Sequence, residues 1–219
     1  MPMPDYTHIL FDLDGTLTDP GLGITNSVMY ALEKFGIRTE DRSALYQYIG
    51  PPLFDSFREF HGFSDDDAHT AISYYREYFS ETGLFENELI PGIPALLERL
   101  KSAGKTLLVA TSKPEDFSVR ILEHFGLLQY FDFVAGACMD ETRTQKWEVI
   151  EWALEHCDCE KEKVLMIGDR HHDAEGAARC GLPCLGVLFG YGSREELCSA
   201  GVVGLAASPE EIGDFILGK

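Results

Sequence analysis

The stretch that decides the fold is Thr7-His8-Ile9-Leu10-Phe11-Asp12-Leu13-Asp14-Gly15-Thr16. Its first half is a short apolar run of strand-forming residues, and the run ends abruptly at two aspartates. Similar apolar runs return at 106–110, 131–135, 164–167 and 184–188, with helical spacing of apolar residues between them. Buried strands that alternate with amphipathic helices predict an α/β fold, a doubly wound parallel sheet covered by helices on both faces.

Between the first and second strands the pattern is helical throughout, from about residue 21 to residue 81. Apolar residues there recur at steps of three and four, beginning with Ile24, Val28, Leu32 and Phe35. We therefore expect a helical cap, residues 19–88, to be inserted into an α/β core made of residues 1–18 and 89–219.

The charge balance limits the classes of partner. The 219 residues include 18 Lys+Arg and 37 Asp+Glu, a formal net charge of −19, which argues against nucleic acids and anionic membranes. No apolar run approaches the roughly 20 residues of a membrane helix, and the N-terminus lacks the pattern of a signal peptide. We expect a cytoplasmic protein whose six cysteines are reduced thiols.

Aspartates collect where the predicted strands end. Asp12 and Asp14 follow the first strand, and Asp169 follows the strand at 164–167, with Asp173 four residues later. Ligands of parallel sheets bind beyond the carboxyl ends of the strands, so these carboxylates should share one site. Because clustered carboxylates repel one another, a divalent cation such as Mg2+ is the expected cofactor.

The other polar residues at these ends suit a phosphoryl group. Thr111 offers a hydroxyl, Ser112 a backbone N–H at a predicted helix start, and Lys146 a positive charge. An attacking carboxylate, a second carboxylate for proton transfer, a metal and a cation are the parts needed for phosphoryl transfer through an aspartyl-phosphate.

At these positions the sequence resembles the haloacid dehalogenase superfamily of phosphatases, whose core is Rossmann-like. The residues that carry the resemblance to its four motifs are Asp12-Leu13-Asp14-Gly15-Thr16-Leu17, Thr111, Lys146 and Gly168-Asp169-x-x-x-Asp173. The phosphoglycolate phosphatase-like branch is the most similar, through Tyr48-Ile49-Gly50-Pro51-Pro52-Leu53 and Thr111-Ser112-Lys113-Pro114. Trp147 departs from the pattern, since many relatives have proline there, and so does the pair His171-His172.

The resemblance implies a role for each residue. Asp12 would be the nucleophile, and Asp14 would protonate the leaving oxygen and then deprotonate the attacking water. Mg2+ would lie on the carboxylates of Asp12 and Asp169 and on the backbone carbonyl of Asp14. Asp173 would orient the metal shell without binding the ion directly.

The cap would select the substrate, a small-molecule phosphate ester. Gly50 and Pro51 would form a rigid turn over the site, and Arg58 is a candidate substrate contact, although a solvated helix-face arginine explains it as well. A phosphoglycolate-like substrate is the first expectation and a nucleoside 5'-monophosphate the alternative. A phosphosugar mutase and a non-catalytic binding module are less favoured. We expect a monomer or a weak homodimer.

Overall fold

The structure is a computed structural model, which describes residues 5–140 and 142–218. Contacts between residues divide the chain into two compact units. The core unit joins the segment that ends at Thr18 to the segment that begins at Leu89, and the helical unit is Asp19–Glu88. Two short strands that pair with each other, β2 (Thr18–Asp19) and β3 (Glu88–Leu89), lie where the chain passes between the units.

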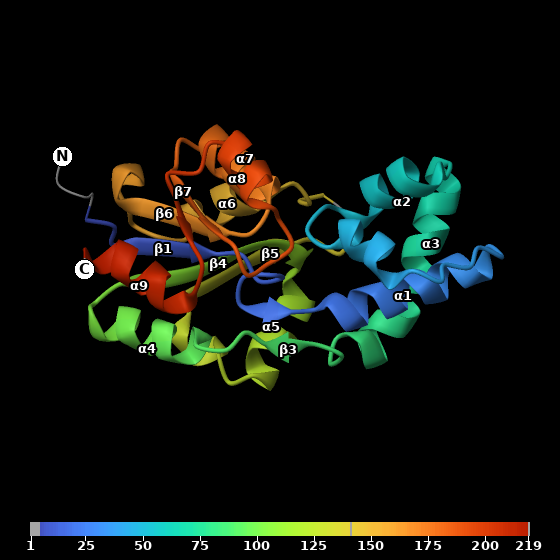
Figure 1. Ribbon diagram of the computed structural model, residues 1–219, viewed down its shortest axis with the longest axis horizontal. Helices are drawn as coiled ribbons and strands as arrows, with labels where there is room; N and C mark the ends of the chain where they lie inside the picture. The colour runs from blue at the N-terminus through green and yellow to red at the C-terminus, as the bar shows by residue number, and fades with distance from the viewer. Residues whose placement is uncertain (1–4, 141, 219) are drawn as a thin grey trace. The chain divides into compact units, whose positions relative to one another are not determined.

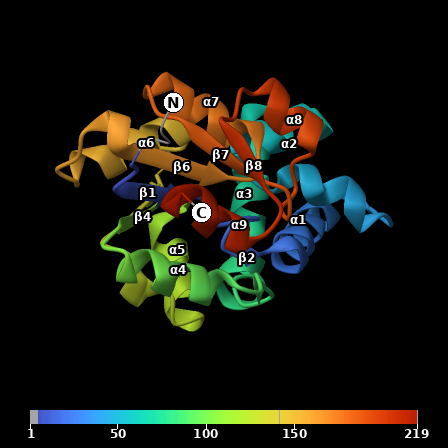
Figure 2. The same ribbon diagram turned by 60° about the vertical axis from the view of Figure 1, so that its left-hand side comes forward.

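The core unit is built on a six-stranded sheet in the order β5-β4-β1-β6-β7-β8 (Figures 1 and 2). Each strand of this sheet pairs in parallel with its neighbours. The strands are β1 (His8–Phe11), β4 (Thr106–Pro114), β5 (Phe133–Ala137), β6 (Val164–Gly168), β7 (Cys184–Val187) and β8 (Gly204–Ala206). The predicted α/β class with a parallel sheet is confirmed.

Helices cover both faces of this sheet, which confirms the doubly wound arrangement. In both ribbon views α6, α7 and α8 lie on one face and α4, α5 and α9 on the other. The helices are α4 (Ile93–Ser102), α5 (Glu115–His124), α6 (Lys146–Glu155), α7 (His171–Arg179), α8 (Arg194–Ser199) and α9 (Pro209–Leu217). Short 3-10 turns occupy Leu128–Tyr130 and Lys161–Lys163.

Burial of the central strands anchors the sheet. Leu10, Leu108 and Met166 lie in one buried apolar cluster with side chains from α6 and α7. Strands that are buried on both faces have no polar side to present to water, which is why they appear in the sequence as continuous apolar runs.

The helical unit contains α1 (Gly21–Lys34), α2 (Leu53–His61) and α3 (Asp65–Tyr78), with a 3-10 segment at Arg42–Tyr48 and a π-helical turn at Phe79–Gly83. Aromatic rings fill its centre: the ring centroids of Phe35 and Phe63 are 4.7 Å apart, and those of Tyr48 and Phe57 are 5.1 Å apart. Gly23 and Gly83 touch so closely that a Cβ on Gly23 would lie 1.9 Å from the carbonyl oxygen of Gly83.

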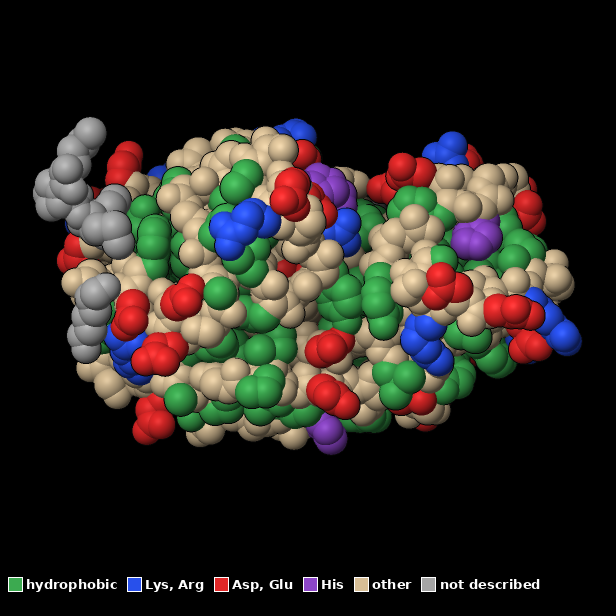
Figure 3. Space-filling view, viewed as in Figure 1, with side chains coloured by type: hydrophobic (Ala, Val, Ile, Leu, Met, Phe, Trp, Pro, Cys, Tyr) green, Lys and Arg blue, Asp and Glu red, His purple; other side chains and the backbone are tan. Residues whose placement is uncertain are grey.

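The surface reflects the composition. Acidic side chains are spread over the face shown in Figure 3 rather than gathered in one patch. None of the described helices is both long enough and apolar enough to cross a bilayer.

Candidate active site

Three neighbouring strands deliver the predicted site residues to one edge of the sheet. Asp12 directly follows β1, Asp169 directly follows β6, and Thr111 lies in the last part of β4. Because β1 pairs with both β4 and β6, the carboxyl ends of all three strands lie side by side. The backbone N–H of Asp12 extends the pairing by donating to the carbonyl of Ile167 at 2.9 Å.

Lys146, the first residue of α6, is buried between two of the aspartates. Its Nζ lies 2.8 Å from Oδ1 of Asp12 and 2.8 Å from Oδ1 of Asp173, and it donates to the carbonyl of Ala110 at 3.2 Å. Burial alone would lower the pKa of Lys146, but the charges of Asp12 and Asp173 outweigh burial and raise it. The side chain is therefore a permanent cation beside Asp12.

The backbone of α7 makes room for this lysine. A Cβ on Gly176 would lie 2.7 Å from Cγ of Lys146, so only glycine lets α7 pass this close. Asp173 is fixed in turn, because its Oδ2 accepts the backbone N–H of Arg170 at 3.0 Å.

Asp14 pairs with a lysine that the sequence analysis did not assign to the site. Nζ of Lys113 lies 2.8 Å from Oδ2 of Asp14, and the two side chains are only 5% and 9% exposed. Burial raises the pKa of Asp14, and the ammonium group of Lys113 offsets part of that rise. A signal was available: Lys113 is two residues after Thr111, and alternate residues of a strand lie on the same face.

Three carboxylates form the acidic part of the site. One oxygen each from Asp12, Asp169 and Asp173 lies within 4.8 Å of the others, and all three residues are buried. Burial and the charges of Asp173 and Asp12 raise the pKa of Asp169 well above its usual range. Burial also raises the pKa of Asp173 to about 6, although the ammonium group of Lys146 opposes it.

These carboxylates fit a divalent cation. Oδ1 of Asp169 is buried and has no hydrogen-bond partner among the described residues, while Oδ2 accepts the N–H of Tyr191 at 2.7 Å. A Cβ on Gly15 would lie 2.3 Å from Oδ2 of Asp169, and one on Gly190 would lie 2.4 Å from it. A buried, unpartnered carboxylate oxygen beside two other carboxylates is a hard oxygen site of the kind that Mg2+ prefers.

The prediction that Ser112 lies at the start of a helix is wrong. Thr111 is 2% exposed and its Oγ1 accepts the N–H of Lys113 at 3.3 Å. Ser112, however, lies inside β4, which continues to Pro114, and α5 begins only at Glu115. Pro114 is extended, with φ −51° and ψ 135°, and a residue that precedes proline is disfavoured in a helix. The N–H of Ser112 therefore belongs to a strand and gains nothing from a helix dipole.

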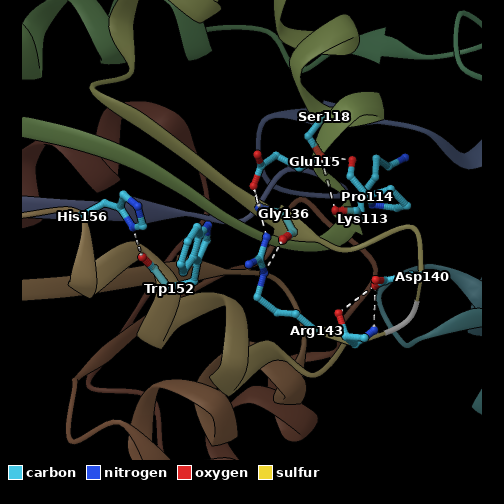
Figure 4. Close-up of polar contacts among 10 residues, drawn as sticks. Lys113, Pro114, Glu115, Ser118, Gly136, Asp140, Arg143, Trp152 and His156 are labelled. Atoms are coloured by element: carbon cyan, nitrogen blue, oxygen red, sulfur yellow. Dashed lines mark hydrogen bonds and ion pairs between the residues drawn. The ribbon is translucent and has the colours of Figure 1, made fainter.

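Arg143 contacts the segments next to Lys113 and Lys146 (Figure 4). Its Nε donates to the carbonyl of Gly136 at 2.9 Å, and one Nη lies 3.3 Å from Oε2 of Glu115. The guanidinium carbon is 4.6 Å from the centre of the Trp152 ring. The end of β5, the start of α5 and the body of α6 are thus held by one side chain, three residues before Lys146.

The two histidines in the fourth motif belong to the first turn of α7. Nδ1 of His171 lies 2.8 Å from Oε1 of Glu196, which also accepts the backbone N–H of His171 at 2.9 Å. Burial and the neighbouring His171 and Arg170 lower the pKa of His172 to about 4, so this imidazole is neutral at pH 7.

Gly50, Pro51 and Arg58 lie in the helical unit. Gly50 has φ 111°, a backbone conformation that favours glycine, and Pro51 is half-buried. Nε of Arg58 lies 2.9 Å from Oδ1 of Asp65, on side chains that are 50% and 68% exposed. Arg58 therefore has a partner within its own unit, and contact of these three residues with substrate stays a prediction.

Comparison with known proteins identifies the family. Residues 9–187 match the family model "Haloacid dehalogenase-like hydrolase". The chain belongs to this family. The matched segment runs from β1 to the end of β7, so it includes the whole helical unit and the predicted core-unit site residues Asp12, Asp14, Thr111, Ser112, Lys146, Asp169 and Asp173.

Relatives of this haloacid dehalogenase-like hydrolase are similar over most of their length. The chain is 49% identical to a 5'-nucleotidase of Pseudomonas aeruginosa over 88% of this chain and 87% of that protein. It is 39% identical to the tyrosine-protein kinase PtkA of Mycobacterium tuberculosis over 95% and 72%. A phosphoglycolate phosphatase of Aquifex aeolicus is 32% identical over 84% and 85%.

Solved structures of haloacid dehalogenase-like hydrolases share the fold. A predicted phosphatase from Clostridium acetobutylicum superposes with a TM-score of 0.95 at 48% identity, over 98% of this chain and 99% of that one. The chain is a phosphatase of this family, a phosphoric monoester hydrolase.

Proposed function

We propose that the protein hydrolyses its phosphate ester through an aspartyl-phosphate on Asp12, with Mg2+ as the cofactor. The observation that carries the proposal is the position of Asp12, which is buried at a strand end, 2.8 Å from the ammonium group of Lys146 and within the carboxylate cluster of Asp169 and Asp173. The ammonium group of Lys146 offsets the negative charge of the Asp12 carboxylate, the proposed nucleophile, as the phosphate approaches it.

The metal would be held by the carboxylates of Asp12 and Asp169 and by the backbone carbonyl of Asp14. When bound, Mg2+ supplies positive charge that offsets these carboxylates and the phosphate oxygens. Asp173 would not bind the metal directly. It contacts Lys146 and the backbone of Arg170, and it thereby fixes the Lys146 ammonium group beside Asp12.

Phosphate oxygens would be bound by the Thr111 hydroxyl, the N–H of Ser112 and the Lys146 ammonium group. Asp14 would transfer the protons. Burial raises the pKa of the Asp14 carboxyl group, so it can carry a proton to the leaving oxygen and then accept one from water. Lys113 would hold this carboxyl group in place through its 2.8 Å contact.

For the substrate we favour a nucleoside 5'-monophosphate, because the relative named 5'-nucleotidase is 49% identical over 88% of the chain. Phosphoglycolate is the second candidate. Its support is the relative named phosphoglycolate phosphatase, at 32% identity over 84% of the chain. The groups proposed to bind the phosphate would serve both substrates equally. Selectivity would therefore depend on contacts with the part of the ester that is not phosphate.

The test is phosphate release from nucleoside 5'-monophosphates, phosphoglycolate and sugar phosphates, each with Mg2+ and with EDTA. We expect Mg2+-dependent release, fastest from a nucleoside monophosphate. Asp12→Asn should lose more than about 1,000-fold in kcat, because the amide cannot attack phosphorus. Asp116→Asn, at an exposed position in the first turn of α5, is the matched control and should keep full activity.

Two results would contradict the proposal. Activity that survives EDTA would show that the reaction does not depend on Mg2+. An active Asp12→Asn enzyme would show that the reaction does not pass through an aspartyl-phosphate on Asp12. A sugar phosphate that is isomerised without phosphate release would indicate a mutase instead.

A further inference from the structure

Two cysteines that the phosphatase site does not use lie in contact just beyond α6. Cys157 and Cys159 are separated only by Asp158, and their Sγ atoms are 2.9 Å apart. Both are free thiols and both are half-buried. Cys157 also donates to the carbonyl of Leu154 in the last turn of α6 at 3.6 Å. The two sulfurs are therefore held together at a fixed point of the core unit.

The geometry needs little change to form a bond. The sulfurs of a disulfide are about 2.05 Å apart, so this pair has to close by about 0.9 Å. We propose that Cys157 and Cys159 form a modification site, a dithiol that hydroperoxides oxidise to an intramolecular disulfide. The proposal is independent of the phosphatase reaction, because α6 is ten residues long and separates the pair from Lys146 by about 15 Å.

The two thiols take different parts in the reaction. Burial and the contact with Cys159 raise the pKa of Cys157 to about 12, so Cys157 keeps its proton. In the first step Sγ of Cys159 attacks the hydroperoxide, the O–O bond breaks, and a sulfenic acid and an alcohol (water, for hydrogen peroxide) are formed. In the second step Sγ of Cys157 attacks the sulfenic sulfur, and the departing hydroxide takes the Cys157 proton to form water. Two thiols and one hydroperoxide thus give one disulfide, one alcohol and one water.

The other four thiols lack this arrangement. Within the part of the chain that the structure describes, none of them has another sulfur in hydrogen-bonding contact. Cys180 is buried and donates to the carbonyl of Trp147 at 3.4 Å, and Cys184 is buried and donates to the carbonyl of Leu185 at 3.8 Å. Cys198 is exposed, and it serves as a measure of ordinary thiol oxidation.

The sequence makes the test direct. Cleavage after lysine and arginine releases residues 147–161, which hold only Cys157 and Cys159, and residues 180–194, which hold only Cys180 and Cys184. The folded protein is treated with a stoichiometric amount of hydrogen peroxide, and the remaining thiols are then alkylated in denaturant. The protein is cleaved, and the masses of the peptides are measured by mass spectrometry. We expect peptide 147–161 to escape alkylation and to weigh about 2 Da less than its reduced form, while peptide 180–194 is alkylated twice. A reductant added before alkylation should restore the double label.

Variants locate the reaction. Cys157→Ser and Cys159→Ser should each abolish the unalkylated peptide, and Cys198→Ser should leave it unchanged. The proposal is overturned if Cys198 is oxidised while peptide 147–161 stays alkylated twice, or if peptide 180–194 forms a disulfide as readily. The wild-type measurement needs no variant to fold, so it decides the question alone.

Discussion

The ammonium group of Lys113 lies 2.8 Å from the carboxylate of Asp14, and both side chains are almost fully buried. Lys113 thus joins the end of β4 to the proposed proton carrier, two residues after Thr111, the proposed phosphate contact. A buried charge pair of this kind is costly to break, because the partner that remains is left without compensation.

Lys113→Met should destabilise the protein by about 3 kcal/mol, since it leaves the Asp14 carboxylate buried and unpaired. Combining it with Asp14→Asn should cost clearly less than the sum of the two single variants. Urea unfolding of all four proteins measures the difference. The control is Lys105→Met: Lys105 pairs at 2.9 Å with Asp5, whose side chain is 85% exposed, and its loss should cost less than about 1 kcal/mol. Additive losses at Lys113 and Asp14 would show that the pair is not coupled.

Mg2+ should stabilise the protein more at pH 7 than at pH 5. The pKa of Asp173 in the folded protein is about 6, above the ordinary 3.8, so the stability it contributes is complete below about 3.8 and is lost as the pH rises through about 6. The raised pKa of Asp169 acts in the same direction. At pH 7 the ionised carboxylates repel one another and a cation held by Asp169 offsets that repulsion, whereas at pH 5 protons compete with the cation.

The measurement is the melting temperature with Mg2+ and with EDTA at both pH values. A Mg2+ concentration 100-fold above Kd stabilises by about 2.7 kcal/mol, which corresponds to several degrees. An equal or larger rise at pH 5 would contradict the assignment of Asp169 to the metal and of Asp173 to its immediate surroundings.

Gly190→Ala should weaken metal binding. The added Cβ would lie 2.4 Å from Cβ and Oδ2 of Asp169 and 2.5 Å from the carbonyl oxygen of Gly15, so the Asp169 carboxylate and the loop after β1 have to move. We expect the Mg2+ concentration for half-maximal activity to rise at least about tenfold. Gly104→Ala is the contrasting variant: φ is 76° but nothing lies within 4 Å of the new Cβ, so it should cost about 1 kcal/mol of stability and leave the Mg2+ dependence unchanged. Equal Mg2+ dependence in the two variants would show that Asp169 tolerates the displacement.

Arg143→Ala should lower kcat about tenfold with a smaller change in KM, because it releases the segment that leads to Lys146. The variant loses the bonds to Gly136 and Glu115 and the contact with Trp152. Arg143→Lys keeps the charge but not the two-pronged geometry, and should restore only part of the rate. Guanidinium added to the alanine variant should recover activity if the side chain acts by position. If kcat is unchanged in a folded Arg143→Ala protein, Arg143 has no part in placing Lys146.

Sequence patterns located most of the site because its residues follow buried strands. The apolar runs before Asp12 and Asp169 predict the strands, and parallel pairing then brings the two carboxylates together. Lys146 is predicted only as a helix start, but the capping pair formed by Gln145 and Glu148 fixes that start. These residues depend on local signals, and local signals are what a single sequence contains.

The remainder depended on tertiary contacts. The partnership of Lys113 with Asp14 joins β4 to the loop after β1, which no local pattern encodes. The strand β8 and the helices α8 and α9 were not predicted, since β8 is only three residues long, although Ser193 and Ser208 cap the two helices that flank it.

The central position of β1 also constrains how the protein is made. This strand is synthesised before both of the strands that flank it, which begin at Thr106 and Val164. One edge of β1 has no native neighbour until β4 has been synthesised, and the other has none until β6 has been synthesised. Closing such distant pairings is slow, because the entropy of a long loop is lost before any contact compensates for it. The helical unit, whose contacts are all within residues 19–88, can fold before the strands that follow it have been synthesised.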